Sequence, residues 1–355
     1  MKAHLTSRVY LLFSALLLAG PNQNSMAISQ TQERAQVLAR DPIPVAENKI
    51  HVIVDTDANN ELDDQHALAY LFFNGKTFVV EGVTVNATKN GGHIEEHMEE
   101  AERVMRMCGV FGKIPLLKGA DKSFKEILPE IKNKSFDGSE AVDFIIEACK
   151  KTGSEKLVLL PIGKLTNIAL ALAKEPAIAE KIKIVWLGSN YPERGEYNKE
   201  NDVDSMNYIL SLDVPFEMVT VRYGKQSGTA NIYVTQTEVF KQMPGLGPST
   251  GPIEGRHGGL FSNFGDYSVN LFSHCDFYGE PPHRSLFDMA AVAILKNPDS
   301  LKLLPLPYQT ENDGVVHRRN RSEKTNSRNN RQNWKRDRRV CLQQALCWAQ
   351  DRASV

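Results

Sequence analysis

The chain reads His51-Val-Ile-Val-Asp55-Thr-Asp57-Ala-Asn-Asn-Glu-Leu-Asp63-Asp64, so four aspartates follow a short apolar run. The run is typical of a buried strand, and Ala67-Leu-Ala-Tyr-Leu-Phe-Phe73 continues as the start of a packed helix. These carboxylates therefore lie at the carboxyl end of a strand, where open α/β sheets bind their ligands. Carboxylates this close repel one another unless a cation, protons or hydrogen bonds compensate, and calcium or magnesium accepts such oxygen ligands. A second interpretation is that Asp63 or Asp64 caps the helix while Asp55 and Asp57 fill a turn.

The body of the chain alternates short β-rich apolar runs with helical stretches between about residues 48 and 300. This alternation indicates parallel βαβ units, and it predicts an α/β fold with an open, mostly parallel, Rossmann-like sheet and helices on both faces. We expect strands over Lys49 to Asp55, Val79 to Asn86, Lys156 to Pro161, Ile182 to Gly188 and Phe216 to Val221. We expect helices over Ile94 to Cys108, Glu140 to Lys150, Leu165 to Lys174 and Ser285 to Leu295, where apolar residues recur at three- and four-residue steps.

Polar residues follow several of these strands. Asn86 opens a glycine-containing loop, and Gly163, in the loop after the third strand, lets the backbone approach a ligand closely. The loop after the fourth strand, 188–198, is rich in side chains suited to sugar hydroxyls. Asp288 lies among apolar residues at a helix start, where it is costly to bury without a partner; a metal would explain it, and so would a charge that favours the helix dipole. Right-handed crossovers place all these loops at one edge of the sheet.

The ends of the chain differ from its body. Residues 1–27 carry two basic residues, an apolar run and small polar residues, which is the pattern of a secretory signal peptide, and the alternative is an uncleaved anchor. Residues 28–47 read as a linker, and no later stretch approaches the roughly 18 apolar residues of a membrane span. We therefore expect a periplasmic or secreted protein without a stable membrane span, with its domain over residues 48–310.

Residues 311–355 form a basic segment, with eleven Lys and Arg against five Asp and Glu. Two interpretations stay open for it: a disordered arm that binds anions, or an aberrant end that replaces a normal final strand and helix. The net charge of the whole chain is -1, so the body is acidic, which argues against nucleic acid as a partner. Five cysteines without zinc-type pairing make a disulfide framework an unlikely support for the fold. The sequence leaves the oligomeric state open, with a homo-oligomer as one expectation.

Taken in order, these segments resemble the inosine-uridine-preferring nucleoside hydrolase family from about residue 50 to about 297. Asp55-Thr-Asp57 and Asp63-Asp64 match the two ends of the family's aspartate loop, with two extra residues and no Pro-Gly between them. The resemblance also covers Asn86, the segment Pro161 to Leu170, Asn190 with Glu196-Tyr-Asn198, and Phe287-Asp288, where the family has His-Asp. It implies a nucleoside hydrolase type of fold.

The resemblance also implies roles for individual residues. Calcium would be held by Asp57, Asp64, Asp288 and the backbone carbonyl of Ile162. The ribose hydroxyls would be held by Asp63, Asn86, Asn190, Glu196 and Asn198. Asp57 would accept the proton of the attacking water. The expected activity is calcium-dependent hydrolysis of the N-glycosidic bond of ribonucleosides, or of a related N-ribosyl compound, to free base and ribose.

The leaving group is where the sequence departs from the family. Phe287 replaces the family's histidine and cannot donate a proton, although it could stack on a base. Candidate donors lie in the polar segment of about 250–285, which reads as a flap, and they are His257, Tyr267, His274, Tyr278, His283 and Arg284. Two other functions stay open: a non-catalytic, calcium-dependent nucleoside or sugar receptor, and a phosphatase of the haloacid dehalogenase type with Asp55 as nucleophile.

Overall fold

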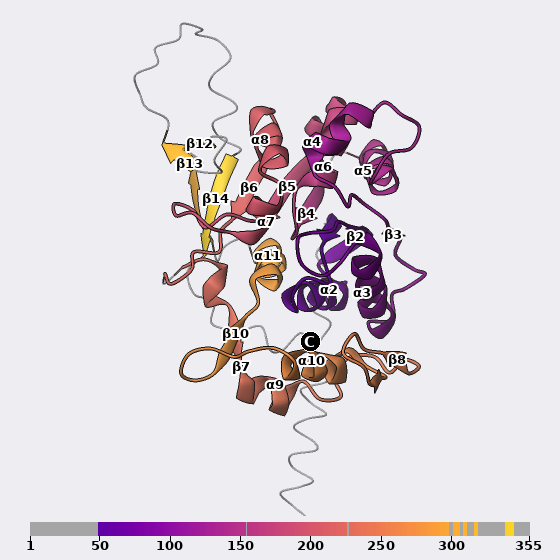
Figure 1. The fold of residues 1–355 in the computed structure, drawn as a ribbon, viewed down its shortest axis with the longest axis vertical. Coiled ribbons are helices and arrows are strands. Elements are labelled where there is room, and N and C mark those ends of the chain that lie inside the picture. The colour runs from indigo at the N-terminus through magenta and orange to yellow at the C-terminus, as the bar shows by residue number, and fades with distance from the viewer. Residues whose placement is uncertain are drawn as a thin grey trace, which may run out of the picture. The chain divides into compact units, whose positions relative to one another are not determined.

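The computed structural model describes residues 49–153, 155–225 and 227–297, and beyond them the backbone of four short strands between residues 301 and 343. The chain divides into two units, Met1–Glu47 and Asn48–Val355. The expected signal peptide (1–27) and linker (28–47) lie outside the described residues, so the following concerns the second unit alone (Figure 1).

A parallel sheet forms the centre of this unit. Its parallel strands lie side by side in the order β14 (Arg338–Gln343), β6 (Phe216–Val219), β5 (Ile182–Leu187), β4 (Leu157–Pro161), β1 (Ile50–Thr56), β2 (Phe78–Val85) and β3 (Leu116–Leu117). Strand β11 (Leu301–Pro305) pairs antiparallel with β14 at the edge. The predicted fold class is confirmed, and the five predicted strands correspond to β1, β2, β4, β5 and β6.

Helices cover both faces of this sheet. The first face packs against α2 (Asp63–Phe73), α3 (Ile94–Met107), α10 (Phe264–Ser273) and α11 (Phe287–Lys296). The second packs against α4 (Phe124–Ile127), α5 (Ser139–Lys151), α6 (Thr166–Lys174) and α8 (Val203–Ser211). Successive side chains of β1 pack on alternate faces of the sheet: Val52 and Val54 belong to the core on the first face, and Ile53 belongs to the core on the second. Burial on both faces explains why this strand is apolar throughout.

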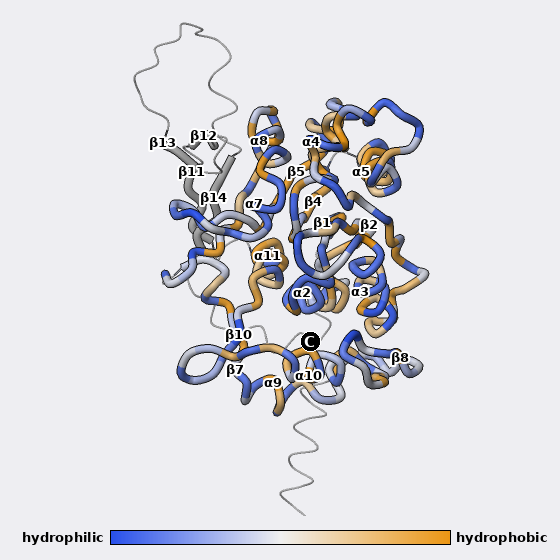
Figure 2. The backbone as a smooth tube through the Cα atoms, viewed as in Figure 1, coloured by the Kyte–Doolittle hydropathy of each residue, from blue (hydrophilic) through white to orange (hydrophobic). Residues whose placement is uncertain are grey.

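Shorter elements complete the described part of the chain. They are the helices α7 (Tyr197–Asn201) and α9 (Gln236–Gln242), the 3₁₀ turns η1 (Leu128–Glu130), η2 (Pro176–Glu180) and η3 (Thr229–Asn231), and three antiparallel pairs. The pairs are β7 (Tyr233–Thr235) with β10 (His283–Ser285), β8 (Ile253–Glu254) with β9 (Leu260–Phe261), and β12 (Tyr308–Thr310) with β13 (Val316–Arg318). The helix expected from Ser285 begins at Phe287, because Ser285 belongs to β10. Figure 2 shows that α11 is mostly hydrophobic.

The basic segment 311–355 contributes to the sheet as well. Within it the backbone of Arg338–Gln343 forms β14, which pairs with β6 on one side and β11 on the other. Most of the remaining segment lies outside the described residues, so the domain boundaries expected at residues 310 and 311 stay predictions. No helix in the described part of the chain is both long and apolar enough to cross a membrane.

The carboxyl ends of β1, β2 and β4 meet at one edge. Asp55 pairs with Thr84 on β2 and with Pro161 on β4. The backbone N–H groups of Asn86 and Ile162 continue this pairing, donating to the carbonyl oxygens of Thr56 and Asp55 at 2.9 and 2.8 Å. The chain leaves β1 toward β2 on one side, and β4 lies on the other, so β1 stands at a topological switch point, where open α/β sheets form their binding crevices.

Candidate active site

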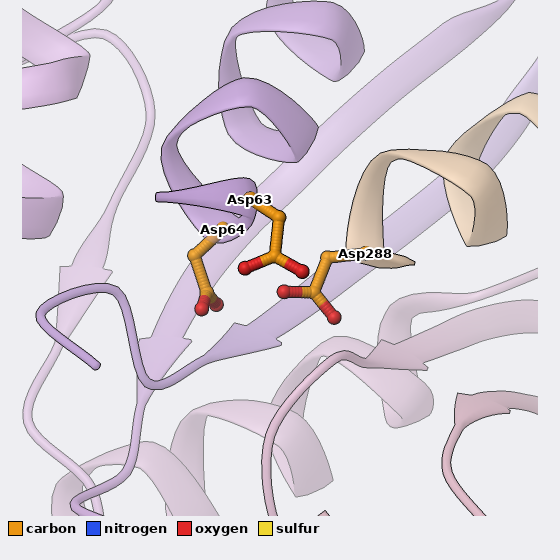
Figure 3. Close-up of side chains that lie close together, drawn as sticks. All are labelled: Asp63, Asp64 and Asp288. Atoms are coloured by element: carbon orange, nitrogen blue, oxygen red, sulfur yellow. The ribbon is translucent and has the colours of Figure 1, made fainter. Parts of the chain in front are cut away.

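Three buried aspartates meet where α2 and α11 begin. Asp63 and Asp64 are the first two residues of α2, and Asp288 is the second residue of α11. One carboxylate oxygen from each lies within 4.8 Å of the others, and Figure 3 shows the three side chains pointing toward one another. They meet because α2 and α11 pack side by side on the same face of the sheet. The sequence separates Asp288 from the other two by more than 200 residues, so only the fold brings them together.

These aspartates are not helix caps. The N-cap of α2 is Leu62, and no side chain caps that helix end. Asp63 and Asp64 point instead toward Asp288, so the cap interpretation is wrong for both residues. Their position in the first turn still places the carboxylates at the positive end of the helix dipole.

Asp55 lies beneath the cluster with both carboxylate oxygens occupied. It accepts hydrogen bonds from Thr84 Oγ1 at 2.6 Å, Asn86 Nδ2 at 2.6 Å and Asn167 Nδ2 at 2.7 Å. Asn167 also donates to the Val85 carbonyl at 3.0 Å and accepts from the Ala120 backbone N–H at 2.9 Å. Asp55 thus holds the loops after β2 and β4 together, and a carboxylate engaged in this way is poorly placed to attack a phosphate.

One carboxylate oxygen of Asp57 accepts a hydrogen bond, and the other has no donor among the described residues. Thr88 Oγ1 donates to Asp57 Oδ2 at 2.5 Å. Asp57 Oδ1 is buried and has no hydrogen-bond partner among the described residues, and the same is true of Asn86 Oδ1 and Asp288 Oδ1. Buried acceptors rarely stay without a donor or cation in a native protein. Three of them around one cluster therefore indicate a place for a ligand.

Gly163 lets the loop after β4 approach this place. A Cβ atom at residue 163 would lie 2.7 Å from Asp57 Oδ1 and 2.9 Å from Asn86 Nδ2, closer than real Cβ atoms come. Only glycine leaves room for both side chains here. The close approach expected of Gly163 is therefore an approach to the site residues themselves.

Burial makes all five carboxyl groups resist ionisation. It raises the pKa of Asp55 to about 6, of Asp57 to about 7 and of Asp63 to about 6. The pKa values of Asp64 and Asp288 lie well above the ordinary value, first because of burial and then because of neighbouring carboxylates. Burial and mutual repulsion thus favour the protonated forms, and a cation bound here would favour the ionised forms instead.

The donor set fits a hard cation. Calcium binds carboxylate and amide oxygens at about 2.3–2.6 Å, so two ligands on opposite sides of the ion lie about 5 Å apart. The Asp63, Asp64 and Asp288 oxygens lie within 4.8 Å of one another, so a single ion of this size could contact all three. The structure thus groups Asp63, which the resemblance assigns to the sugar, with Asp64 and Asp288. It places Asp57, the expected ligand, beside them, close enough for its charge to raise the pKa of both Asp64 and Asp288.

The carbonyl of Ile162, the fourth expected ligand, accepts a hydrogen bond from Asn198 Nδ2 at 2.7 Å. The same amide group donates to the Leu187 carbonyl at 3.2 Å. Asn198 thus joins the ends of β4 and β5, and the Ile162 oxygen keeps its second lone pair.

Glu196 and Asn190, which are also expected to bind the sugar, form hydrogen bonds within the loop after β5 and with its neighbours. Glu196 caps α7 and accepts from the backbone N–H groups of Ser189, Asn198 and Lys199 at 2.6, 2.8 and 2.8 Å. Asn190 donates to the Arg194 carbonyl at 2.8 Å and accepts from the Tyr223 backbone N–H at 3.0 Å. Their contacts with a sugar stay predictions.

Aromatic rings lie beside the cluster. Phe287 and Tyr223 meet edge to face, with ring centroids 5.7 Å apart at 77°. The pKa of the Tyr223 hydroxyl is raised by burial and then by the negative charges of Glu196 and Asp63, so the phenol keeps its proton. Sequence reasoning missed Tyr223, because it follows β6 in a stretch without any recognisable motif. It also missed Thr88, although its place in the polar loop after β2 was a usable signal.

The six expected donors of segment 250–285 have varied surroundings. Tyr267 is buried and donates to Glu100 at 2.5 Å, and Arg284 pairs with Glu61. His257 and His274 stack on each other with centroids 4.5 Å apart, and His283 contacts Tyr233 with centroids 4.4 Å apart. Tyr278 is exposed. Among the described residues, the ring that Phe287 contacts is that of Tyr223, and none of these six rings or charged groups pairs with it.

The fold and the cluster together define an α/β protein with a buried group of carboxylates at the carboxyl edge of its sheet. The family model of the inosine-uridine preferring nucleoside hydrolases matches residues 52–344, and the chain belongs to that family.

Curated relatives are similar over part of their length. The pyrimidine-specific ribonucleoside hydrolase RihB of Shigella flexneri serotype 5b (strain 8401) is 28% identical over 173 residues, which are 47% of this chain and 50% of that protein. RihB of Escherichia coli O17:K52:H18 (strain UMN026 / ExPEC) matches with the same identity and coverage. The matched stretch spans about half the length of these relatives.

Solved structures show the same fold. A plant nucleoside hydrolase, the PpNRh1 enzyme, superposes with a TM-score of 0.61 at 18% identity, over 83% of this chain and 94% of that one. The purine-preferring ribonucleoside hydrolase from Gardnerella vaginalis superposes with a TM-score of 0.58 at 21% identity, over 82% of this chain and 92% of that one.

Proposed function

We propose that this protein hydrolyses the N-glycosidic bond of ribonucleosides, or of a related N-ribosyl compound, to free base and ribose, and that it requires calcium. The observation that carries the proposal is the set of buried oxygens on Asp57, Asn86 and Asp288 that have no partner among the described residues, gathered around the Asp63–Asp64 pair. Family membership supports the reaction class, and the oxygen-only donor set supports calcium.

The residues present supply two requirements of this reaction. Asp57 has a free oxygen that can accept a proton from the attacking water, while Thr88 fixes the other oxygen. The negative charges of Asp63 and Asp288 favour the positive charge that develops on the sugar at the transition state. Asp63, Asp64 and Asp288 would hold the calcium, which would orient the water and lower its pKa.

In this proposal the leaving base packs against the rings of Tyr223 and Phe287. Burial, and after it the neighbouring carboxylates, raise the pKa of the Tyr223 hydroxyl and keep it protonated, and Phe287 offers a ring for stacking. From the pattern of residues 1–27 we also propose that the protein is periplasmic or secreted.

A second function has its own support. Glu196, Asn190 and Asn198 use their side chains inside the protein, and Phe287 replaces a proton donor. A non-catalytic receptor that binds calcium and a nucleoside would share this site. The phosphatase alternative loses its support, because both oxygens of Asp55 are taken by three donors.

One experiment separates these functions. The protein is incubated with a nucleoside panel and calcium, and released ribose is measured as reducing sugar, beside Asp57→Asn and a phosphate-ester control. Ribose release that disappears in Asp57→Asn supports the hydrolase. Nucleoside binding without any product would favour the receptor, and phosphate release without ribose would contradict both.

A further inference from the structure

The segment Ala58 to Leu62, which separates Asp57 from Asp63, is held at several points. Asn59 Nδ2 donates to the Gly91 carbonyl at 2.7 Å, and the Asn59 backbone N–H donates to His97 Nδ1 at 3.2 Å. These contacts fix the segment to the loop after β2 and to α3. The extra residues that distinguish this chain from the family pattern are therefore part of an ordered structure.

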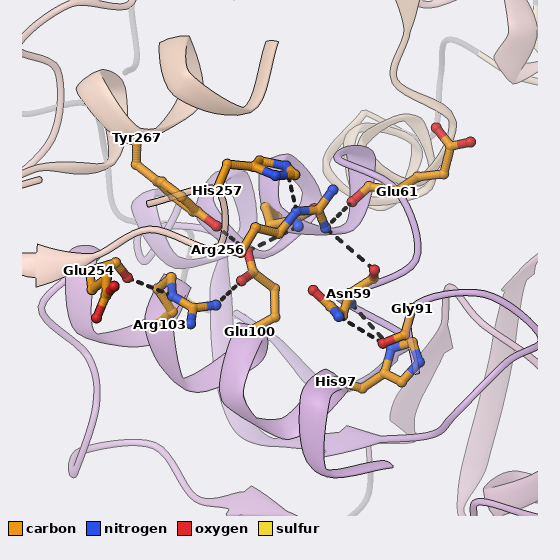
Figure 4. A network of polar contacts seen from close by, with 11 residues as sticks. Asn59, Glu61, Gly91, His97, Glu100, Arg103, Glu254, Arg256, His257 and Tyr267 are labelled. Carbon is orange, nitrogen blue, oxygen red and sulfur yellow. Dashed lines mark hydrogen bonds and ion pairs between the residues drawn. The ribbon is translucent and has the colours of Figure 1, made fainter. Parts of the chain in front are cut away.

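Two arginines from segment 250–285 hold the other side of this loop. Arg256 Nη1 donates to the carbonyls of Glu61 at 2.9 Å and Asn59 at 3.4 Å, and Figure 4 shows its guanidinium facing both residues. Arg284 pairs with the Glu61 carboxylate through Nη2. Arg284 is 15% exposed and Glu61 is 50% exposed, so the cation is largely removed from water.

The positions of these residues connect the two halves of the acid cluster. Glu61 lies in the loop two residues before Asp63, the first residue of α2. Arg284 lies on β10, four residues before Asp288 of α11. The ion pair therefore bridges the two chain segments that deliver the carboxylates to one point. Because helices α2 and α11 start directly after these segments, the bridge restrains the distance between their first turns.

We propose that Glu61, Arg284 and Arg256 form a clamp that sets the spacing of Asp63 and Asp64 relative to Asp288, and that all three are positioning residues for calcium. The inference rests on the cation site of the proposed function and extends it to residues that touch neither cation nor substrate. It assigns a purpose to the segment Ala58 to Leu62, since Asn59 and Glu61 provide the atoms that the arginines bind.

Charge alone predicts a different result for one variant, which makes the proposal testable. If Arg284 acted only through its positive charge, removing that charge would remove a repulsion between Arg284 and calcium, and calcium binding would become stronger. If Arg284 acts through geometry, its removal releases α11 and weakens calcium binding instead. Glu61→Gln does not separate the two ideas, because both predict weaker binding.

The experiment measures calcium affinity by calorimetry on the full chain for wild type, Arg284→Gln, Glu61→Gln and the double variant. We expect Arg284→Gln to weaken calcium binding about tenfold, as losses of residues that orient metal ligands do. The double variant should be no weaker than the poorer single variant, because either change opens the same clamp. Calcium binding by Arg284→Gln as tight as wild type or tighter overturns the proposal, and so does full additivity in the double variant.

Controls separate this outcome from a folding defect and from the reaction itself. Glu147→Gln and Lys150→Gln break an exposed ion pair on α5, on the other face of the sheet, and should leave calcium affinity unchanged. Arg284→Lys keeps the charge but loses the paired N–H donors of the guanidinium, so it should bind calcium with intermediate affinity. This variant keeps the proposal testable if Arg284→Gln fails to fold. Calcium binding without ribose release by wild type would refute only the hydrolase; ribose release without calcium binding would refute the calcium requirement and the clamp, and leave the hydrolysis itself standing.

Discussion

At the scale of residues, the site depends on which carboxylate oxygens are already occupied. Asp55 is engaged by three donors and serves as an internal acceptor, whereas Asp57 has one oxygen tied to Thr88 and one free. The free oxygen of Asp57 makes it the candidate proton acceptor.

We therefore expect Asp57→Asn to reduce ribose release by about 10²–10⁴-fold, the usual effect of removing a general base. The amide is close in size to the carboxylate and can keep the hydrogen bond from Thr88, so the fold should persist. Initial rates at saturating nucleoside and calcium give the measurement. The matched control is Asp143→Asn, which makes the same change at an exposed position on α5. If Asp57→Asn released ribose at a rate near that of wild type, Asp57 would not be the proton acceptor.

Gly163 offers a steric test of the same place. Gly163→Ala should lower ribose release and calcium affinity by roughly tenfold or more, because its Cβ would displace the Asp57 and Asn86 side chains. Gly75→Ala is the control, since a Cβ at residue 75 meets nothing within 4 Å. Equal activity of the two alanine variants would show that the loop after β4 lies away from the reaction.

At the scale of elements, the first turns of α2 and α11 form the site, and α10 supports α2 from behind. His66 on α2 lies fully inside this contact, where burial lowers its pKa to about 4. Its Nδ1–H donates to the Leu62 carbonyl at 2.6 Å, and Ser268 Oγ donates to its Nε2 at 2.7 Å. The neutral ring thus ties the end of the aspartate loop to α10.

Ser268→Ala should destabilise the protein by about 1–3 kcal/mol, because it leaves the Nε2 atom of a buried histidine without a donor. The measurement is chemical denaturation of the calcium-loaded protein. Ser273→Ala, on the exposed end of the same helix, should cost much less. Equal losses for the two variants would mean that the His66 contact contributes little.

The paired helix starts also predict how calcium and pH act together. The pKa values of Asp57 and Asp63 are raised in the fold to about 7 and about 6, so the chelated fold gains stability from these groups below pH 4 and loses it as pH rises through 6 to 7. Calcium binds the ionised groups and removes that loss.

The difference between the thermal midpoints of loaded and chelated protein should therefore grow from pH 5 to pH 8, by roughly 5–10 °C. Melting curves at fixed ionic strength measure it, and the contribution of His66 cancels in the difference. A difference that stays constant, or that shrinks as pH rises, would show that the cation does not bind these carboxylates.

At the scale of the whole molecule, the regular part of the fold could be predicted from the sequence because each βα unit carries its own periodic pattern. The strand before Asp55 is an example, since it is apolar on both faces. The partners of individual side chains could not be predicted in this way. Asp63 is adjacent to Asp64 in sequence, but its contact with Asp288 depends on how α11 packs on α2, and the role of Glu61 depends on Arg284, which is 223 residues away.

The most direct test of this account is calcium-dependent ribose release by the intact protein. Chelated wild type is titrated with calcium at saturating nucleoside, and reducing sugar is measured beside Asp288→Asn, which removes one carboxylate of the cluster. We predict no release before calcium is added, a rise that saturates with one calcium per chain, and a large loss of calcium affinity in Asp288→Asn. Full ribose release in excess chelator, or an Asp288→Asn titration that coincides with that of wild type, would contradict the account.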